Sequence, residues 1–373
     1  MKATWSQTRK ANGDFIQTRV SNIINAWRSG KFMDLSSRPW SLNTYALTKV
    51  WFKCHTVDLR VCDISSVTSK VKSWLFQDQL EKPAEMVLHR PIHAGGMGLH
   101  SVKVKALASL IRTFMETAAN PKFCHSLYHT VLYRVYVLND DSISNPPPLP
   151  PYYSAVFFNT IKQVKSETPL NVTTMSTAQW YRVLVEQNIT MEVTSDNQMK
   201  YIKTRVEIAS PLTDWETSWR RARLKGLGSE ATSFLFKLLH QLLPSEERLS
   251  RILPNTSENC KYCPTPITAD LAHSLFQCVN TREVGSWLLS LVTKHDQSST
   301  AEKLLKLQFD CNDAHELPLV WTIAQTLLYM WGVRVSGKIV SLAMTRAKLE
   351  SKISLLRETR FRNQYTLLQE IIE

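Results

Sequence analysis

Three cysteines and one histidine form the group in this sequence best suited to chemistry. They follow the pattern Cys-x2-Cys-x9-His-x4-Cys, at Cys260, Cys263, His273 and Cys278. Two residues between the first pair let the chain turn back and present two thiolates to one ion, and zinc prefers four sulfur or nitrogen ligands in a tetrahedron. Because all four ligands would come from the protein, the pattern predicts one structural Zn²⁺ ion with no place for a catalytic water. The alternative is a chance grouping of buried cysteines near a surface histidine.

A run of basic residues is a candidate contact to nucleic acid. It contains Arg220, Arg221, Arg223 and Lys225. The run lies on a predicted helix that also carries Trp215 and Trp219, and Thr213-Asp-Trp-Glu216 has the form of a capping box that opens this helix. Guanidinium groups and indole rings on one helix can together meet the phosphates and bases of a strand. A solvated helix face, with both tryptophans in the core, is the alternative.

Lys103 and Lys105 are two further candidate contacts to nucleic acid. They lie in a helix that is predicted to begin after Ser101 as its N-cap and to place four apolar side chains on one face. These are Leu107, Leu110, Ile111 and Phe114. Since the two lysines belong to the polar side of the same helix, an ordinary solvated face is the alternative to a phosphate contact.

Two other motifs are predicted to have no role in catalysis. Asp140 and Asp141 could hold magnesium only in a strand hairpin, and a proline run follows them, so a solvated loop is predicted. Gly95-Gly96-Met97-Gly98 lacks the spacing of a phosphate-binding loop and is predicted to form a tight turn. Because no nucleophile and base stand in a recognised arrangement, we expect a protein that is not an enzyme and has no small-molecule substrate.

The charge of the chain favours a polyanionic partner. Its net charge is +13, and residues 1–120 hold 17 Lys and Arg against 8 Asp and Glu, so +9 of that excess lies in this region. No block of five like charges occurs there, which indicates a basic face on a folded domain more than a basic tail. We therefore expect RNA or DNA as the partner.

The same sequence argues against secretion and against a membrane span. No apolar signal segment follows Met1, and seven cysteines in such a chain fit thiols or metal ligands better than disulfides. The most apolar stretch, 317–333, contains Pro318 and three polar residues, so it is predicted to be a buried helix. We expect an intracellular protein, in the nucleus or cytoplasm, with no membrane partner.

The hydrophobic pattern predicts a mainly α fold in three parts. Apolar residues recur at helical spacing through most of the chain, and no strand-rich region stands out. Five prolines at 146–151 forbid a helix and predict an extended linker. We therefore expect a helical region over residues 1–120, a middle region with the linker over 121–210, and a zinc-binding helical domain over 211–373.

Four segments, in order, resemble the C-terminal portion of reverse transcriptases from non-LTR (LINE-type) retrotransposons. The first, Trp27 to Trp51, is similar to the thumb and connector that follow the palm. The second, Pro91 to Leu99 with Ala106-Leu107, resembles the Gly-Gly-x-Gly-Leu turn of the family and its helix. The third, Ser233 to Leu249 leading into the four zinc ligands, resembles its zinc-binding element. The fourth, Tyr329-Met-Trp331-Gly-Val-Arg334, is similar to a Trp-x-x-Arg helix near the end of many members.

The resemblance implies the ancestry and the function expected of this chain. The palm, with its Tyr/Phe-x-Asp-Asp turn, would precede the thumb and is not in this sequence, so polymerase activity of the chain itself is not expected. The resemblance implies a thumb- and connector-like region followed by a CCHC zinc element that binds template RNA or target DNA. A zinc-stabilised scaffold for protein interaction is the alternative function.

Overall fold

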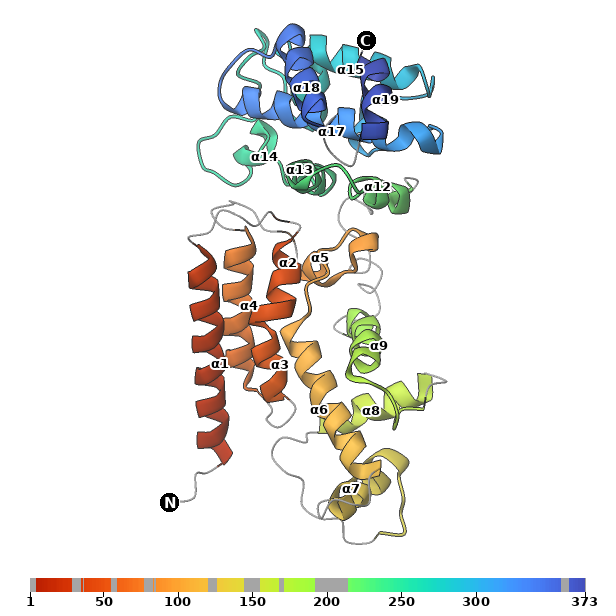
Figure 1. Ribbon diagram of the computed structural model, residues 1–373. Helices are drawn as coiled ribbons and strands as arrows, with labels where there is room; N and C mark the ends of the chain where they lie inside the picture. The colour runs from red at the N-terminus through yellow and green to blue at the C-terminus, as the bar shows by residue number, and fades with distance from the viewer. Residues whose placement is uncertain are drawn as a thin grey trace. The chain divides into compact units, whose positions relative to one another are not determined.

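The computed structural model describes residues 5–28, 35, 37–54, 59–76, 83, 85–119, 126–143, 155–167, 171–191, 214–356 and 362–372. The chain is mainly helical, as predicted, through the residues that the structure describes. Within the described ranges the only β-type pairing is an isolated antiparallel bridge between Asn259 and Thr268. Figure 1 shows the helices in chain order.

The chain divides into two compact units, which interleave in sequence. Unit 1 contains Met1–Met33, Ser37–Gln79 and Gly98–Ile202, and unit 2 contains Asp34–Ser36, Leu80–Met97 and Lys203–Glu373. This division differs from the three parts predicted at 1–120, 121–210 and 211–373.

Unit 1 is built of helices through the residues that the structure describes. In chain order they are α1 (Trp5–Arg28), α2 (Arg38–Ser41), the π-helix η1 (Leu42–Ala46), α3 (Thr48–Cys54), α4 (Val61–Phe76), α6 (Val102–Ala119), α7 (Ser126–Leu138), α8 (Ala155–Glu167) and α9 (Thr177–Met191). Helix α1 lies beside α3 and α4, and α6 lies beside α3, α7 and α9 (Figure 1). Ser101 caps α6 as predicted, because its Oγ accepts a hydrogen bond of 3.4 Å from the Val104 amide.

The middle region is not separate from α6, and an aromatic core explains why. Phe114 of α6 meets Phe157 and Phe158 of α8 edge-to-face at 5.4 and 5.6 Å between ring centroids. Trp180 of α9 is fully buried in the same cluster. Since burial of each large ring is worth roughly 2 kcal/mol or more, this shared core holds α7, α8 and α9 in unit 1. The proline run at 146–151 lies outside the described residues.

Unit 2 is built around one long helix. It contains α5 (Glu85–His89), the 3₁₀-helix η2 (Ile92–Ala94), α12 (Trp215–Arg221), α13 (Ser229–Leu239), α14 (Glu246–Ser250), the π-helix η3 (His273–Gln277), α15 (Arg282–Thr293), α16 (Ala301–Leu305), α17 (Asp313–Val335), α18 (Leu342–Leu356) and α19 (Arg362–Ile372). Helix α17 is buried over most of its length and packs against α13, α15, α18 and α19. It contains the stretch 317–333, which is a buried helix as predicted. In the part of the chain that the structure describes, no helix is long and apolar enough to cross a membrane.

The N-cap of α12 lies one residue after the one that the capping-box pattern predicts. The N-cap of α12 is Asp214, whose carboxylate accepts a hydrogen bond of 3.2 Å from the Thr217 amide, and Thr213 lies outside the described residues. Helix α13 ends at Leu239, and Gln241 in the turn that follows takes a positive φ of 54°. That turn brings His240 against Trp219, at 4.7 Å between ring centroids.

The Gly95-Gly96 turn belongs to unit 2, where it packs on α12. Gly95 has a φ of +79°, and a Cβ there would lie 2.4 Å from the Trp219 ring. The Gly95 carbonyl lies 2.8 Å from His240 Nε2, and the Gly96 carbonyl accepts a hydrogen bond of 2.7 Å from Arg223. The tight turn is therefore confirmed, and the contacts with α12 and His240 explain why residues 80–97 join unit 2.

Candidate metal centre

The structure brings the four predicted ligands together in one cluster. The Sγ atoms of Cys260, Cys263 and Cys278 and the Nε2 atom of His273 lie within 4.8 Å of one another. Cys260 and Cys278 are 3.5 Å apart, Cys263 and Cys278 are 3.9 Å apart, and Cys263 lies 3.5 Å from His273. All three cysteines are free thiols. The group could hold a metal ion.

A short hairpin-like loop positions Cys260 and Cys263. The Cys260 amide donates to the Ile267 carbonyl at 2.8 Å, and the Ala269 amide donates to the Glu258 carbonyl at 2.9 Å. These bonds flank the Asn259–Thr268 bridge and close the loop that contains both thiols. The sequence reason is the polar, proline-containing stretch around the first pair, which favours turns over a helix.

A single turn of π-helix positions His273 and Cys278. The Asp270 side chain accepts a hydrogen bond of 2.6 Å from the His273 amide, and the His273 carbonyl accepts one of 2.8 Å from the Cys278 amide. The turn ends at Cys278, which has an extended backbone conformation. π-Helical turns are rare and occur often at functional sites. Here the five-residue step directs the imidazole and the thiol toward the same point.

Arg334 lies against the cluster, a role that the sequence did not predict. Its Nη1 donates to Cys278 Sγ at 3.2 Å and its Nη2 donates to Cys260 Sγ at 3.5 Å. Nη2 also donates to Glu246 at 3.0 Å, and the guanidinium lies over the Tyr262 ring at 4.8 Å. The Tyr262 hydroxyl donates to the Arg334 carbonyl at 2.7 Å. The last turn of α17 is thus tied to the loop that contains the thiols.

The groups around the cluster shift the pKa values of the two buried thiols, Cys260 and Cys278, in opposite directions. Burial alone would raise the pKa of Cys260, but hydrogen bonds from Arg334 and the Tyr262 amide outweigh burial and lower the pKa to about 6. Burial raises the pKa of Cys278 to about 11, and the neighbouring Cys260 sulfur adds to the increase. The pair therefore favours one negative charge at neutral pH, at Cys260. A cation between the sulfurs would favour the second thiolate, because positive charge lowers the pKa of a thiol that binds it.

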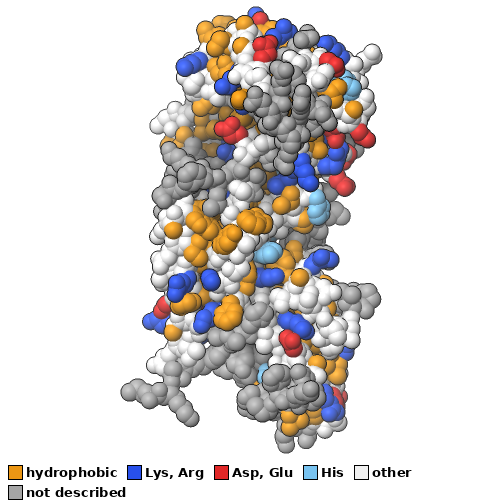
Figure 2. Space-filling view, in the orientation of Figure 1, with side chains coloured by type: hydrophobic (Ala, Val, Ile, Leu, Met, Phe, Trp, Pro, Cys, Tyr) orange, Lys and Arg blue, Asp and Glu red, His pale blue; other side chains and the backbone are white. Residues whose placement is uncertain are grey.

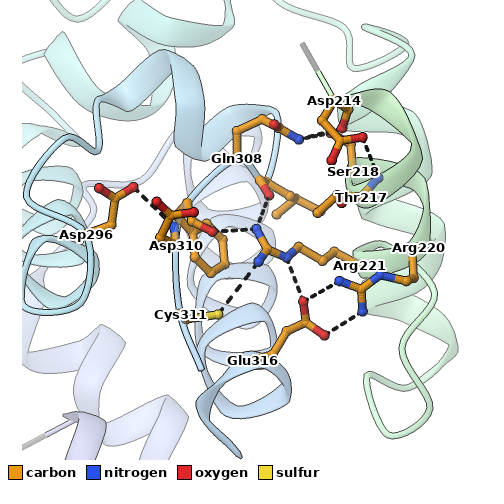
Figure 3. A network of polar contacts seen from close by, with 12 residues as sticks. Asp214, Thr217, Ser218, Arg220, Arg221, Asp296, Gln308, Asp310, Cys311 and Glu316 are labelled. Atoms are coloured by element: carbon orange, nitrogen blue, oxygen red, sulfur yellow. Dashed lines mark hydrogen bonds and ion pairs between the residues drawn. The ribbon is translucent and has the colours of Figure 1, made fainter. Parts of the chain in front are cut away.

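The predicted basic run is largely engaged inside unit 2. Arg221 is buried and donates to the Leu307 and Phe309 carbonyls at 2.8 Å and to Glu316 at 3.0 Å. Arg220, which is half exposed, forms two hydrogen bonds of 2.6 Å to the same carboxylate. Figure 3 shows both guanidinium groups converging on Glu316. These two arginines tie α12 to α17 and to the segment before it.

The other two members of the run differ from each other. Arg223 is half-buried and donates to the Gly96 carbonyl, and burial lowers the pKa of its guanidinium. Lys225 is exposed. The neighbouring Trp219 is buried and stacks on Trp215 at 5.2 Å. Trp219 is therefore a core residue, as in the alternative interpretation of this helix.

The lysines of α6 also take different positions. Lys103 is exposed, whereas Lys105 is half-buried with its ammonium 5.1 Å from the centroid of the Tyr181 ring. Burial lowers the pKa of Lys105. Asp140, in the loop after α7, pairs with Arg134 at 2.6 Å and accepts a hydrogen bond from Ser142, so this loop has the solvated form that was predicted.

No protein-family model matches the chain, and a search of curated proteins gives no match. The assignment of the site therefore depends on its residues and their geometry.

Proposed function

We propose that the chain binds one structural Zn²⁺ ion and acts as a nucleic-acid-binding protein related to the non-LTR reverse transcriptases. The observation that carries the proposal is the convergence of Cys260, Cys263, His273 and Cys278 on one point, from two segments, at the spacing that the resemblance implies.

The donor set and its distances support zinc. For a zinc–sulfur bond of about 2.3 Å, two sulfurs of a tetrahedral site lie about 3.8 Å apart, and a sulfur and a nitrogen lie about 3.5 Å apart. The cysteine–cysteine distances of 3.5 and 3.9 Å and the cysteine–histidine distance of 3.5 Å fit these edges. Three thiolates and one imidazole are soft to borderline donors, which suit zinc better than magnesium or calcium.

The ion would act on the fold and not on a substrate. When bound, Zn²⁺ supplies a cross-link between the 258–269 loop and the η3 turn. Three thiolates around a divalent cation leave one net negative charge, and the Arg334 guanidinium at 3.2 Å from Cys278 offsets it. Glu246 in turn holds Arg334, so the centre is coupled to both α14 and α17.

Net charge and its distribution support nucleic acid as the partner. The excess of +9 in residues 1–120 lies mostly in unit 1, whereas Arg220, Arg221 and Arg223 have partners inside unit 2. We therefore assign phosphate neutralisation mainly to unit 1 and a structural role to this run. Binding by dispersed lysines and arginines releases counterions, so affinity falls steeply as salt rises.

The test combines metal analysis with binding. Purified full-length chain should contain one equivalent of zinc, and Cys260→Ser and Cys263→Ser should lower the zinc content and the melting temperature of unit 2. Cys62→Ser, an exposed thiol of unit 1, is the control. Affinity for a fluorescent 20-nucleotide RNA or DNA should fall about 10-fold or more between 50 and 200 mM salt. Unchanged zinc in the two variants, or an affinity independent of salt, would contradict the proposal.

A groove in unit 2 favours a second candidate, a scaffold for protein interaction. A cavity of about 530 Å³ lies along α17 and α18. It is lined by apolar side chains, including the highly exposed Ile339, by polar side chains that include Glu230 and Gln325, and by three lysines, Lys338, Lys348 and Lys352. An apolar groove with a basic rim suits an acidic amphipathic helix.

The two functions give different results with the same protein. Under the scaffold function, a synthetic acidic amphipathic helix should bind, and Lys348→Glu should weaken it while the chain shows no salt-dependent affinity for nucleic acid. Under the nucleic-acid function, Lys348→Glu should leave oligonucleotide affinity within about 2-fold, because the groove lies in unit 2.

A further inference from the structure

Unit 1 has large aromatic side chains on its surface that are not buried in its core. Trp40 is 62% exposed, Tyr45 54%, Phe52 76% and Phe15 43%. We call these four residues the aromatic face. A single exposed apolar residue is ordinary, but a contiguous group of large rings usually marks a binding surface.

The segment from α2 to α3 places Trp40, Tyr45 and Phe52 along one exposed side. Trp40 and Tyr45 meet edge-to-face at 6.0 Å between ring centroids. Tyr45 lies in η1, which continues into α3 through Leu47, and Phe52 follows seven residues later, about two helical turns. The opposite side of the same segment is buried, at Leu42, Ala46, Leu47, Val50 and Cys54. The rings are therefore outward because the apolar inner face is already filled.

Basic side chains lie between the rings. Lys49 is exposed four residues after Tyr45 and three before Phe52, which is the spacing of neighbours on a helix face. The Lys53 ammonium and the Arg19 guanidinium each lie 5.3 Å from the centroid of the Phe15 ring. Figure 2 shows hydrophobic side chains over α1 and α3 with Lys and Arg side chains among them.

We infer that the aromatic face binds single-stranded nucleic acid, with unpaired bases stacked on its rings and phosphates on the exposed Arg19 and Lys49. This inference rests on the proposed function and names the surface and the form of its partner. Aromatic rings interleaved with cations are the means by which proteins hold unpaired strands without reading their sequence. The bases of a duplex are already stacked on one another. Its phosphates can therefore contact the cations, but its bases cannot stack on the rings.

The cations also argue against a purely apolar partner. Closing a protein interface over Arg19 and Lys49 would remove two charges from water, at a cost that only matched carboxylates would offset. The phosphates of a strand supply those charges, and the bases supply the flat apolar surfaces. A second copy of this chain would bring the same two positive charges, so self-association through this face is disfavoured.

The test compares ring and charge variants on one fold. Phe52→Leu and Trp40→Leu keep an apolar side chain and remove the ring, and Lys49→Gln removes one charge. Leu127→Ala is the matched control, because Leu127 is 74% exposed in unit 1 but lies on α7. Each variant is zinc-loaded, checked for its melting temperature, and titrated with a fluorescent 20-nucleotide strand and with the corresponding 20-base-pair duplex.

Each ring variant should weaken single-strand binding about 10-fold and change duplex binding less than 2-fold. Lys49→Gln should reduce the slope of log affinity against log salt by about 1. If both ring variants bound the single strand as tightly as wild type does, the inference would be overturned. The proposed function would still stand in that case, because the wild-type chain would still bind nucleic acid. A wild-type chain that binds no nucleic acid would instead remove the proposed function itself. Sedimentation that shows a dimer dissociated by Phe52→Leu would assign the face to self-association and overturn the inference.

Discussion

The guanidinium of Arg334 lies 3.2 Å from the sulfur of Cys278, and its other terminal nitrogen reaches Cys260 and Glu246. Arg334 is almost fully buried at the end of α17. A buried cation is costly unless it is paired, and here the thiols and one carboxylate pair it. The cluster is therefore best described as three thiols, one imidazole and one buried cation that pairs with two of the sulfurs.

Replacing Arg334 tests that description. Arg334→Met keeps the bulk of the side chain but removes every donor to the sulfurs, so thiolates become harder to form and zinc affinity should fall about 10- to 100-fold. Arg334→Lys keeps the positive charge but loses the planar guanidinium with its two terminal donors. Its zinc affinity should therefore lie between those of Arg334→Met and wild type. Competition with a chromophoric chelator measures the affinity. The control is Arg282→Met on the exposed side of α15, and equal affinities for Arg334→Met and wild type would show that the arginine only packs.

The pairing of Glu316 with Arg220 and Arg221 gives a second prediction. Glu316→Ala leaves the Arg221 guanidinium buried with two carbonyl partners and no countercharge, so unit 2 should lose about 2–4 kcal/mol of unfolding free energy. Glu302→Ala removes an exposed partner of Lys306 and should cost about 0.5 kcal/mol or less. Urea unfolding followed by tryptophan fluorescence gives both values. Equal losses in the two variants would mean that the network adds no more than a surface pair.

The same network shows why the sequence alone did not predict that Arg220 and Arg221 are paired inside unit 2. A count of positive residues cannot distinguish an arginine that faces solvent from one that a distant carboxylate holds, and Glu316 is 95 residues from Arg221. The N-cap of α12 was ambiguous for a simpler reason, because Thr213 and Asp214 are neighbours in sequence and both are good N-caps. Only the position of the first helical residue, Trp215, decides between them.

The four residues of the Cys/His cluster were predictable because their information is local. A Cys-x2-Cys turn and a His-x4-Cys step each fix two ligands within one short segment, so the four residues could be named without knowing the fold. Arg334 could not be named in this way, since it lies 56 residues after Cys278 and meets it only when α17 is docked. The one sequence signal was a lone arginine at the end of a long apolar helix, where a buried charge needs a partner. The mainly α class was predictable for the opposite reason, because helical periodicity recurs along the whole chain.

The contact of Gly95 with Trp219 gives a third prediction. Gly95→Ala must accommodate a left-handed φ of +79° and a Cβ 2.4 Å from the indole ring. Gly337→Ala has nearly the same φ, +78°, but its Cβ would meet nothing within 4 Å. The control should therefore cost about 1–2 kcal/mol from backbone strain alone, and Gly95→Ala should cost about 2 kcal/mol more, typical of overpacking. Thermal unfolding of both variants checks the difference, and equal melting temperatures would show that the turn does not depend on its packing against α12.

The Asp296 carboxylate gives a prediction about pH. Its Oδ1 accepts hydrogen bonds from the Ser298 amide and hydroxyl at 2.9 and 2.7 Å, and its Oδ2 accepts from the Ser299 hydroxyl at 2.8 Å and the Asp310 amide at 3.2 Å. The hydrogen bond from Ser298 is the largest cause, opposed by burial and helped by Ser299 and Asp310, and together they lower the pKa to about 2. Because the folded state holds the charged form below the ordinary pKa of about 3.9, stability from this group is complete above about pH 4. It is lost as the pH falls from about 4 to about 2.

Asp296→Asn isolates that contribution. At pH 7 the variant should be less stable than wild type by about 1–2 kcal/mol, since an amide cannot accept all four hydrogen bonds. The difference between the two proteins should shrink as the pH falls from 4 toward 2, because protonation of wild-type Asp296 removes the same acceptor. Subtracting the variant from wild type at each pH cancels the acid sensitivity that both proteins share, including that of the thiolate ligands. Ser299→Ala, which removes one donor to Oδ2, should raise the pKa of Asp296 in the folded state, so the loss should end at a higher pH and be smaller. A difference that stayed constant down to pH 2 would show that the carboxylate charge does not hold the α15–α16 turn.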